Sequence, residues 1–150
     1  MSVSPRGRAE AVDALVQDVM DANDVPGASV AIVHHGDVVY QPSYGVADRA
    51  AERPATDSTI YQLASATKAI ASAAMWTSVP FDDTTIDAIE GYGIGWTVDA
   101  QERHRRAWHS GGGKAIVAHY PDDALTVILL TDRAGFDVVS PAFEIAALYL

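Results

Sequence analysis

The length, composition and charge of the chain exclude several classes of protein. Its 150 residues, 49% of them hydrophobic, suit a single globular domain with a substantial core. The formal net charge is -10, from 20 acidic and 10 basic residues, which argues against nucleic-acid or anionic-membrane partners because both require a basic surface. The sequence has no cysteine, so disulfide bonds, thiolate catalysis and cysteine-ligated zinc are excluded. There is no apolar signal core and no run of transmembrane length, so a cytoplasmic protein is expected.

The first third of the chain predicts a helix followed by two strands. An amphipathic helix is expected over residues 5–24, because apolar side chains recur at helical spacing at Val12, Leu15, Val16 and Val19. The apolar run 28–34 predicts a strand covered on both faces. A tight turn then leads into a second strand, 38–44, in which Pro42 indicates an edge position or a bulge. The polar segment 48–58 is expected to be a surface loop.

Residues 64–76, ASATKAIASAAMW, predict a helix that is small or apolar on every side and therefore buried. Its one charge is Lys68, and a buried ammonium is costly without a partner or a lowered pKa. Because residues i and i+3 share a helix face, the Lys68 amine can accept the proton of the Ser65 hydroxyl, which makes Ser65 a candidate nucleophile. Ser65 also stands at the expected start of the helix, where free backbone N–H groups and the helix dipole favour a developing oxyanion. The alternative is a chance Ser-x-x-Lys match whose lysine reaches out to solvent.

The second half of the chain predicts a run of strands and a closing helix. Residues 77–91 are rich in turn residues and acids, so a linker is expected there. The short basic run 103–106 is expected to be a solvated loop. Strands are predicted at 92–98, 107–109, 115–120 and 125–131, with a turn at 121–123.

The last predicted element is a helix near the C-terminus. Ser140-Pro141 would begin it, and its apolar face would carry Val139, Phe143, Ala146, Ala147 and Leu150. The order of elements predicts an α+β fold within one domain, residues 1–150. That fold is an antiparallel β-sheet flanked by N- and C-terminal helices, with the Ser-x-x-Lys helix buried.

A second candidate site segment is His109 to Gly113. Three consecutive glycines allow a substrate to approach the backbone closely, and an adjacent imidazole can donate a hydrogen bond or supply positive charge. A flexible glycine turn with a surface histidine is the alternative. The other histidines are scattered and do not show the spacing of a helical metal site, so no metal or cofactor is expected.

Four runs of the chain, in this order, carry a family resemblance: PGASVAIVHHGDVVYQPSYGVAD, TIYQLASATK, YGIGW and WHSGGGKAIVAHYPDDALTVILLTD. Together they resemble the serine β-lactamase and penicillin-binding-protein superfamily, and within it the class C β-lactamases, D-aminopeptidases and β-lactamase-fold esterases. The resemblance implies that Ser65 is acylated and that Lys68 takes part in proton transfer. It also implies that the backbone N–H groups of Ser65 and Gly112 form an oxyanion hole, and that His109, Ser110 and Gly111 bind the substrate.

The chain also departs from that family. Members carry a helical domain between the serine helix and the YGIGW-like strand, and this domain supplies a tyrosine that helps to move protons. Here residues 77–91 take its place and contain no tyrosine, so a shortened form is expected, without the third catalytic element and without one wall of the cleft. The tyrosines in other segments are not expected to replace it; they are Tyr44, Tyr61, Tyr92 and Tyr120.

Two hypotheses follow for the function. The first is a serine hydrolase that acts through an acyl-enzyme at Ser65 on small esters or amides, with a small-molecule acyl substrate as its partner. The second is a catalytically impaired remnant of the fold that serves as a binding or assembly module. Because the missing domain would have covered part of the serine helix, a homodimer is also expected, with Met75 and Trp76 at or near the contact.

Overall fold

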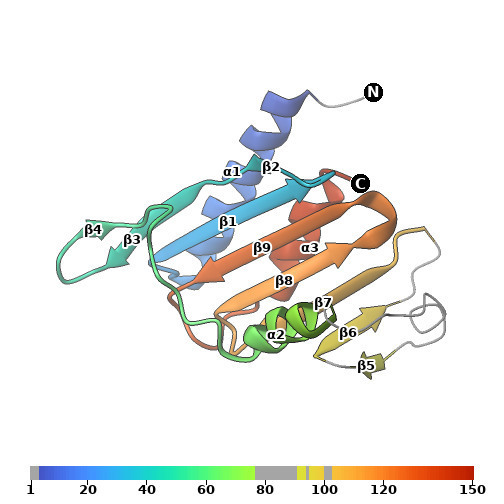
Figure 1. Cartoon of the computed structure of the whole chain (residues 1–150). Helices are drawn as coiled ribbons and strands as arrows, with labels where there is room; N and C mark the ends of the chain where they lie inside the picture. The colour runs from blue at the N-terminus through green and yellow to red at the C-terminus, as the bar shows by residue number, and fades with distance from the viewer. Residues whose placement is uncertain (1–3, 77–90, 94, 100–102) are drawn as a thin grey trace.

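The computed structural model describes residues 4–76, 91–93, 95–99 and 103–150, without the side chains of 73–76 and 91–93. Within these residues the chain forms a nine-stranded sheet in which every pair of neighbours is antiparallel. Two helices cover one face of this sheet, and a third lies on the other face (Figure 1). The α+β fold with an antiparallel sheet and flanking terminal helices is therefore confirmed.

The elements follow one another in the order α1 (Pro5–Asn23), β1 (Gly27–His34), β2 (Asp37–Tyr40), β3 (Ser43–Asp48), β4 (Arg53–Pro54), the 3-10 turn η1 (Ala64–Ala66), α2 (Thr67–Trp76), β5 (Gly91–Gly93), β6 (Trp96–Asp99), β7 (Arg106–Gly111), β8 (Ala115–Tyr120), the 3-10 turn η3 (Pro121–Asp123), β9 (Leu125–Thr131) and α3 (Val139–Ala147). In the sheet the strand order is β4-β3-β1-β9-β8-β7-β6-β5, and β2 pairs with β1.

The main core lies between the sheet and helices α1 and α3. Alternate side chains of β1, β8 and β9 point to this face and are buried, as the period of two in a strand requires. The α1 stripe contributes Val12 and Val16, both buried, and α3 contributes Ile145 and Ala146. Full burial of one large aliphatic side chain contributes about 1.5–3 kcal/mol, so this layer is the main source of stability.

The opposite face of the sheet is only half covered. In β1 the alternate residues Ser29, Ala31 and Val33 are half-buried, and Ile128 and Leu130 of β9 are half-buried on the same face. The expectation that strand 28–34 is covered on both faces is therefore wrong. Ala31, Ile128 and Leu130 line a small pocket beside the segment 56–61, and α2 sits over the far end of the sheet near β7 (Figure 1).

Two predicted strands are divided in the structure. Residues 38–44 form β2 and β3, which separate at Gln41 and Pro42 because proline has no N–H for the ladder. Both strands pair with β1 along the same edge. Residues 92–98 were expected as one strand but belong to a hairpin, β5 and β6, in which Gly95 adopts a φ of 85° that favours glycine.

Other boundaries also differ from the prediction. Helix α3 begins at Val139, before Ser140-Pro141, because the Asp137 carboxylate accepts the N–H groups of Val139 and Ser140 at 2.9 and 3.3 Å. In the basic run, Arg106 is the first residue of β7 and is not in a loop. The predicted linker, apart from Gly91 in β5, lies outside the described residues.

Asp13 of α1 fastens this helix to the edge of the sheet. Its Oδ1 atom accepts hydrogen bonds from the hydroxyls of Tyr40 and Tyr44, at 2.6 and 2.7 Å. Hydrogen bonds to a charged group contribute about 1.5–3 kcal/mol each, and these are half-buried, so we expect Asp13→Ala to lower the free energy of unfolding by about 2 kcal/mol. Urea denaturation measures this change. The exposed Asp18 on the same helix is the matched control, and Asp18→Ala is expected to change stability by less than about 0.5 kcal/mol.

The same cluster gives the stability a dependence on alkaline pH. Burial, and then Asp13, raises the pKa of Tyr40 from 10.0 to about 12, and the pKa of Tyr44 is raised by the same causes. Both hydroxyls hold their protons more tightly in the folded chain than in the unfolded chain. Their contribution is therefore complete below pH 10 and is lost as the pH rises toward 12. In Asp13→Ala, stability should fall less steeply over this interval.

Candidate active site

Ser65 lies in a sharp turn between the loop 55–63 and helix α2. Ala64 has a φ of 46°, Ala64–Ala66 form the 3-10 turn η1, and α2 continues from Thr67. Across this turn the Lys68 ammonium donates to the Ser65 hydroxyl, with Nζ and Oγ 3.1 Å apart. The i, i+3 spacing thus brings the two candidate catalytic side chains into hydrogen-bond contact.

Helix α2 is not buried on all sides, so the expected burial of Lys68 is wrong. Ala66, Ala69 and Ser72 are buried, whereas Lys68 is exposed and Ile70 is 54% exposed. The helix is apolar all round in sequence, but a single sheet can cover only one side of it. Lys68 is therefore solvated and needs no compensation for lost hydration.

Strand β7 approaches the serine turn at the distance of backbone contact. A Cβ atom on Gly111 would lie 1.9 Å from the Leu63 carbonyl oxygen and 2.9 Å from the Ala66 nitrogen. Only glycine allows this approach. Gly112 follows with a φ of 56°, and a Cβ at its position would be 3.8 Å from the Ala64 side chain. The structure therefore brings Gly111 and Gly112 to the turn that carries Ser65.

His109 lies on the same sheet face as Gly111, and Ser110 lies on the other, because side chains alternate along a strand. His109 is only 9% exposed. Burial lowers the pKa of its imidazole, and the positive charge of Lys68 lowers it further. A neutral imidazole is therefore favoured at pH 7. In the site, His109 would act by a hydrogen bond and would not supply positive charge. Ser110 pairs with the buried Ile116 on the core side of the sheet.

Three of the tyrosines in other segments make their described contacts with groups other than Ser65. Tyr44 is bound to Asp13, and the Tyr61 hydroxyl lies 3.0 Å from Ser29 Oγ. Tyr120 is buried in the main core. The side chain of Tyr92 is outside the description. None of these contacts provides a described replacement for the family's tyrosine.

Two contacts that support α2 were not predicted from the sequence. Gly95 lies against the start of the helix, where a Cβ would be 2.8 Å from the Lys68 carbonyl oxygen. The Trp96 indole N–H donates to Ser72 Oγ at 2.9 Å. Together they dock the β5–β6 hairpin on α2, beside Lys68. In the sequence, the two glycines of YGIGW indicate a close approach of the backbone, which fits the first contact. No sequence feature indicates the second contact.

Backbone strain at Ala64 gives a prediction for this turn. A left-handed conformation costs an L-residue about 1–2 kcal/mol, and glycine avoids this cost but loses about 0.4–1 kcal/mol through the entropy of the unfolded chain. We expect Ala64→Gly to raise the free energy of unfolding by about 0.5–1 kcal/mol. Urea denaturation measures the gain. Ala64→Val, whose branched Cβ tolerates this φ poorly, should have the opposite effect, and destabilisation by Ala64→Gly would contradict the assigned strain.

The described part of the chain holds no group of three or more His, Asp or Glu side chains suited to a metal ion. Nor does any described helix combine the length and hydropathy needed to cross a membrane.

Comparison with known proteins connects this geometry to one family. The family model for β-lactamases matches residues 12–80, which include the first strands, Ser65 and Lys68. Esterase EstB of Burkholderia gladioli is 31% identical over 87 residues, 58% of this chain and 22% of the esterase. A β-lactamase of Pseudomonas fluorescens is 34% identical over 59 residues, 39% of this chain and 16% of the enzyme.

Among solved structures, the chain is similar to EstCE1, a hydrolase with promiscuous acyltransferase activity. The identity is 31%, the TM-score is 0.41, and the match covers 45% of this chain and 18% of EstCE1. The matched part thus spans about a fifth of the length of these relatives. The family match and the two sequence relatives support a relationship between this chain and proteins of the serine β-lactamase fold, over the part of the chain that carries Ser65 and Lys68.

Proposed function

We propose that this chain is a serine hydrolase that forms an acyl-enzyme at Ser65 on small esters or amides. The observation that carries the proposal is the 3.1 Å contact between Lys68 Nζ and Ser65 Oγ. An amine at this distance is within reach of the hydroxyl proton, as a general base must be. The glycine-rich end of β7 lies beside the same turn, and its backbone N–H groups would serve there as oxyanion donors.

In the proposed reaction Ser65 Oγ bonds to the substrate's carbonyl carbon while its proton passes to the neutral amine of Lys68. The N–H groups of Ser65 and Gly112 stabilise the resulting oxyanion. The bond to the leaving group then breaks, and Lys68 returns the proton to the departing alkoxide or amine. Water attacks the acyl-serine in the same way, with its proton passing through Lys68 to Ser65. His109 holds the substrate by a hydrogen bond from its neutral imidazole.

The names of the relatives support this reaction class, since one is an esterase and another a β-lactamase. Activated esters are the expected first substrates, because a good leaving group demands less proton transfer than an amide does. The missing family tyrosine affects that transfer most. We therefore expect a larger loss, relative to complete family members, on amides than on activated esters.

The test is covalent labelling of Ser65. Incubation with a fluorophosphonate should add one adduct to the intact mass, and peptide mapping should place it on Ser65. Ser65→Ala is the control and should stay unlabelled. If the wild-type chain stays unlabelled at a high reagent concentration while folded, the chain is the non-catalytic remnant that serves as a binding or assembly module.

We further propose that the chain forms a homodimer through the uncovered side of α2. Ile70 on this side is 54% exposed, and exposed apolar surface on a helix is often an interface. The predicted contacts of Met75 and Trp76 lie outside the described side chains. Sedimentation equilibrium over a dilution series should show a dimer of the 15.9 kDa chain, which Ile70→Glu dissociates. A monomer at high micromolar concentration would refute the dimer.

A further inference from the structure

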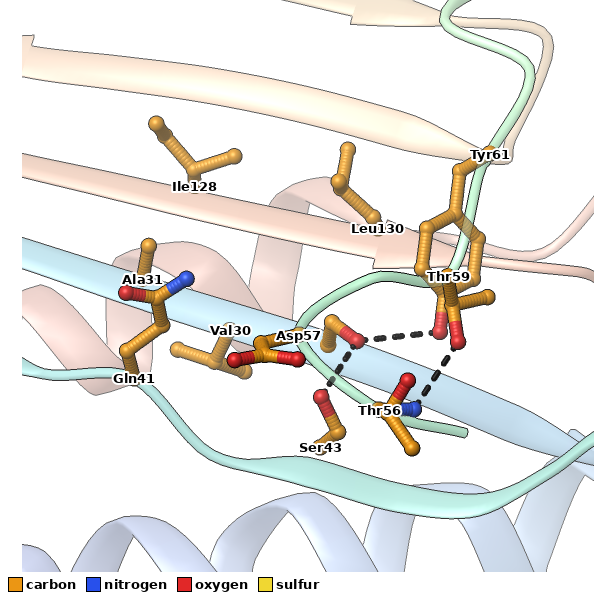
Figure 2. Close-up of a pocket in the computed structure, with 11 residues that line it drawn as sticks. Val30, Ala31, Gln41, Ser43, Thr56, Asp57, Thr59, Tyr61, Ile128 and Leu130 are labelled. Atoms are coloured by element: carbon orange, nitrogen blue, oxygen red, sulfur yellow. Dashed lines mark hydrogen bonds between the residues drawn. The ribbon is translucent and has the colours of Figure 1, made fainter. Parts of the chain in front are cut away.

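A small pocket lies apart from Ser65, on the half-covered face of the sheet over β1 and β9. Its volume is about 80 Å³, room for roughly three water molecules at about 30 Å³ each, or for a short organic molecule. The apolar floor consists of Ala31, Ile128 and Leu130, and the segment 56–61 forms the opposite wall (Figure 2). Ser65 and Lys68 do not line it.

The wall of the pocket is held in place before any ligand binds. The Thr59 hydroxyl accepts the N–H of Thr56 at 2.8 Å, and the Thr59 N–H donates to the Thr56 carbonyl at 3.0 Å. The Ser58 hydroxyl donates to the Asp57 carboxylate at 3.0 Å. Figure 2 shows this carboxylate directed toward the side of the pocket formed by Gln41 and Ser43. A preformed wall lowers the entropy cost of binding.

Three hydroxyls form a chain along one side of the pocket. Ser29 Oγ lies 2.9 Å from Ser43 Oγ and 3.0 Å from Tyr61 Oη (Figure 2). These hydroxyls carry three protons, and the two bonds between them use two. One hydroxyl proton is therefore left unused. Rotation of the hydroxyls reverses the direction of the two bonds, so the unused proton can belong to either end, and the opposite end then offers an oxygen lone pair to a donor.

Charge decides which ligand suits the pocket. Asp57 is the single charged residue among those that line it, and no lysine, arginine or histidine does so. Burial is the largest cause of the raised pKa of Tyr61, and the nearby Asp132 carboxylate adds to it. Asp57 thus lines the pocket and Asp132 lies near it, in a chain whose net charge is already -10. An anion is disfavoured, and a cation is favoured.

We propose that this pocket binds a short alkylammonium. The ammonium group donates to the Asp57 carboxylate and to the Ser43 hydroxyl, and the alkyl chain lies on Ile128 and Leu130. Three donors on a compact cation match the acceptor oxygens along one wall, and a chain of two or three carbons fits the apolar floor. With so few atoms, the dissociation constant is expected to be on the order of 1–10 mM.

The test is a titration of the ¹⁵N-labelled chain with propylammonium chloride, followed by amide NMR at constant ionic strength. The amides of Ser29, Ser43 and Tyr61 should shift and saturate together. 1-Propanol and sodium propionate are the matched ligands without positive charge, and neither should saturate in this range. Asp57→Asn should weaken binding about three- to tenfold. Asp21→Asn, an exposed carboxylate on α1, should leave it unchanged.

Ser65→Ala should bind propylammonium as the wild-type chain does, so this test succeeds or fails independently of catalysis. Equal responses to propylammonium and 1-propanol would overturn the proposal. So would an unchanged dissociation constant in Asp57→Asn, or shifts that follow net charge over the whole surface without saturation at the pocket.

Discussion

Gly111→Ala is expected to reduce the rate of Ser65 labelling by at least about 100-fold, because a misplacement of about 1 Å has an effect of this size on positioned groups. The added methyl carbon would lie 1.9 Å from the Leu63 carbonyl oxygen. The Leu63 carbonyl belongs to the backbone, and the position of the added Cβ is fixed by the backbone of residue 111, so no change of rotamer can relieve the contact. Either β7 or the turn Ala64–Ala66 must move, and each movement separates Gly112 from Ser65.

This substitution should also lower the free energy of unfolding, by about 1–3 kcal/mol, as overpacking usually does. Gly36→Ala is the control for a glycine replaced elsewhere. It has a φ of 86° and no atom within 4 Å of the added Cβ, so it introduces strain without a clash. It should destabilise the chain while Ser65 labels at the wild-type rate. Wild-type labelling of a folded Gly111→Ala would show that the close approach of β7 is not needed.

Lys68→Met is expected to slow the labelling of Ser65 by about 10²–10⁴-fold, the usual contribution of a general base. The variant keeps a long side chain but removes the amine that contacts Ser65 Oγ. Because Lys68 is exposed, the free energy of unfolding should change by less than about 0.5 kcal/mol. A buried lysine would instead have predicted that its removal stabilises the chain.

The sequence provides a matched control, since Lys114 is its one other lysine. Lys114 Nζ donates to Gln62 Oε1 at 3.1 Å. Gln62 is close to Ser65 in sequence, but the described hydrogen bond of Lys114 is not to Ser65. Lys114→Met should therefore label at nearly the wild-type rate. Second-order labelling rate constants across pH 6 to about 10 measure both variants. If Lys68→Met labelled at full rate, another group would be the base.

Periodicity predicted the elements that build the main core. The spacing of Val12 and Val16 identified the buried side of α1, and the apolar run 125–131 identified β9, which the structure places between β1 and β8. The ends of elements were predicted less well, because a single capping residue or a single turn residue decides where a helix or strand begins or ends. Asp137 replaced Ser140 as the acceptor at the start of α3, and Gly95 turned a predicted strand into a hairpin.

The candidate site was predictable where spacing alone decides contact, as for Ser65 and Lys68 in one helical turn. Exposure of Lys68 was not, because burial of a helix depends on which surfaces the rest of the chain brings to it. The left-handed conformation of Ala64 was not predictable either, since alanine gives no signal for a positive φ. The contact of Gly111 with Leu63 joins residues far apart in sequence, so only the fold reveals it.

The two faces of the sheet contribute unequally to stability, so the chain is expected to have one region that opens locally and another that opens only on global unfolding. The layer formed with α1 and α3 is closed by its own side chains, whereas η1 and α2 lie on the other face, against β7 and the β5–β6 hairpin (Figure 1). Local opening of the serine turn should therefore occur without global unfolding. In native-state hydrogen exchange, amides of β1, β8 and β9 should exchange only when the whole chain unfolds, and those of α2 much sooner. Substrate or inhibitor bound at Ser65 would then slow exchange in α2 selectively.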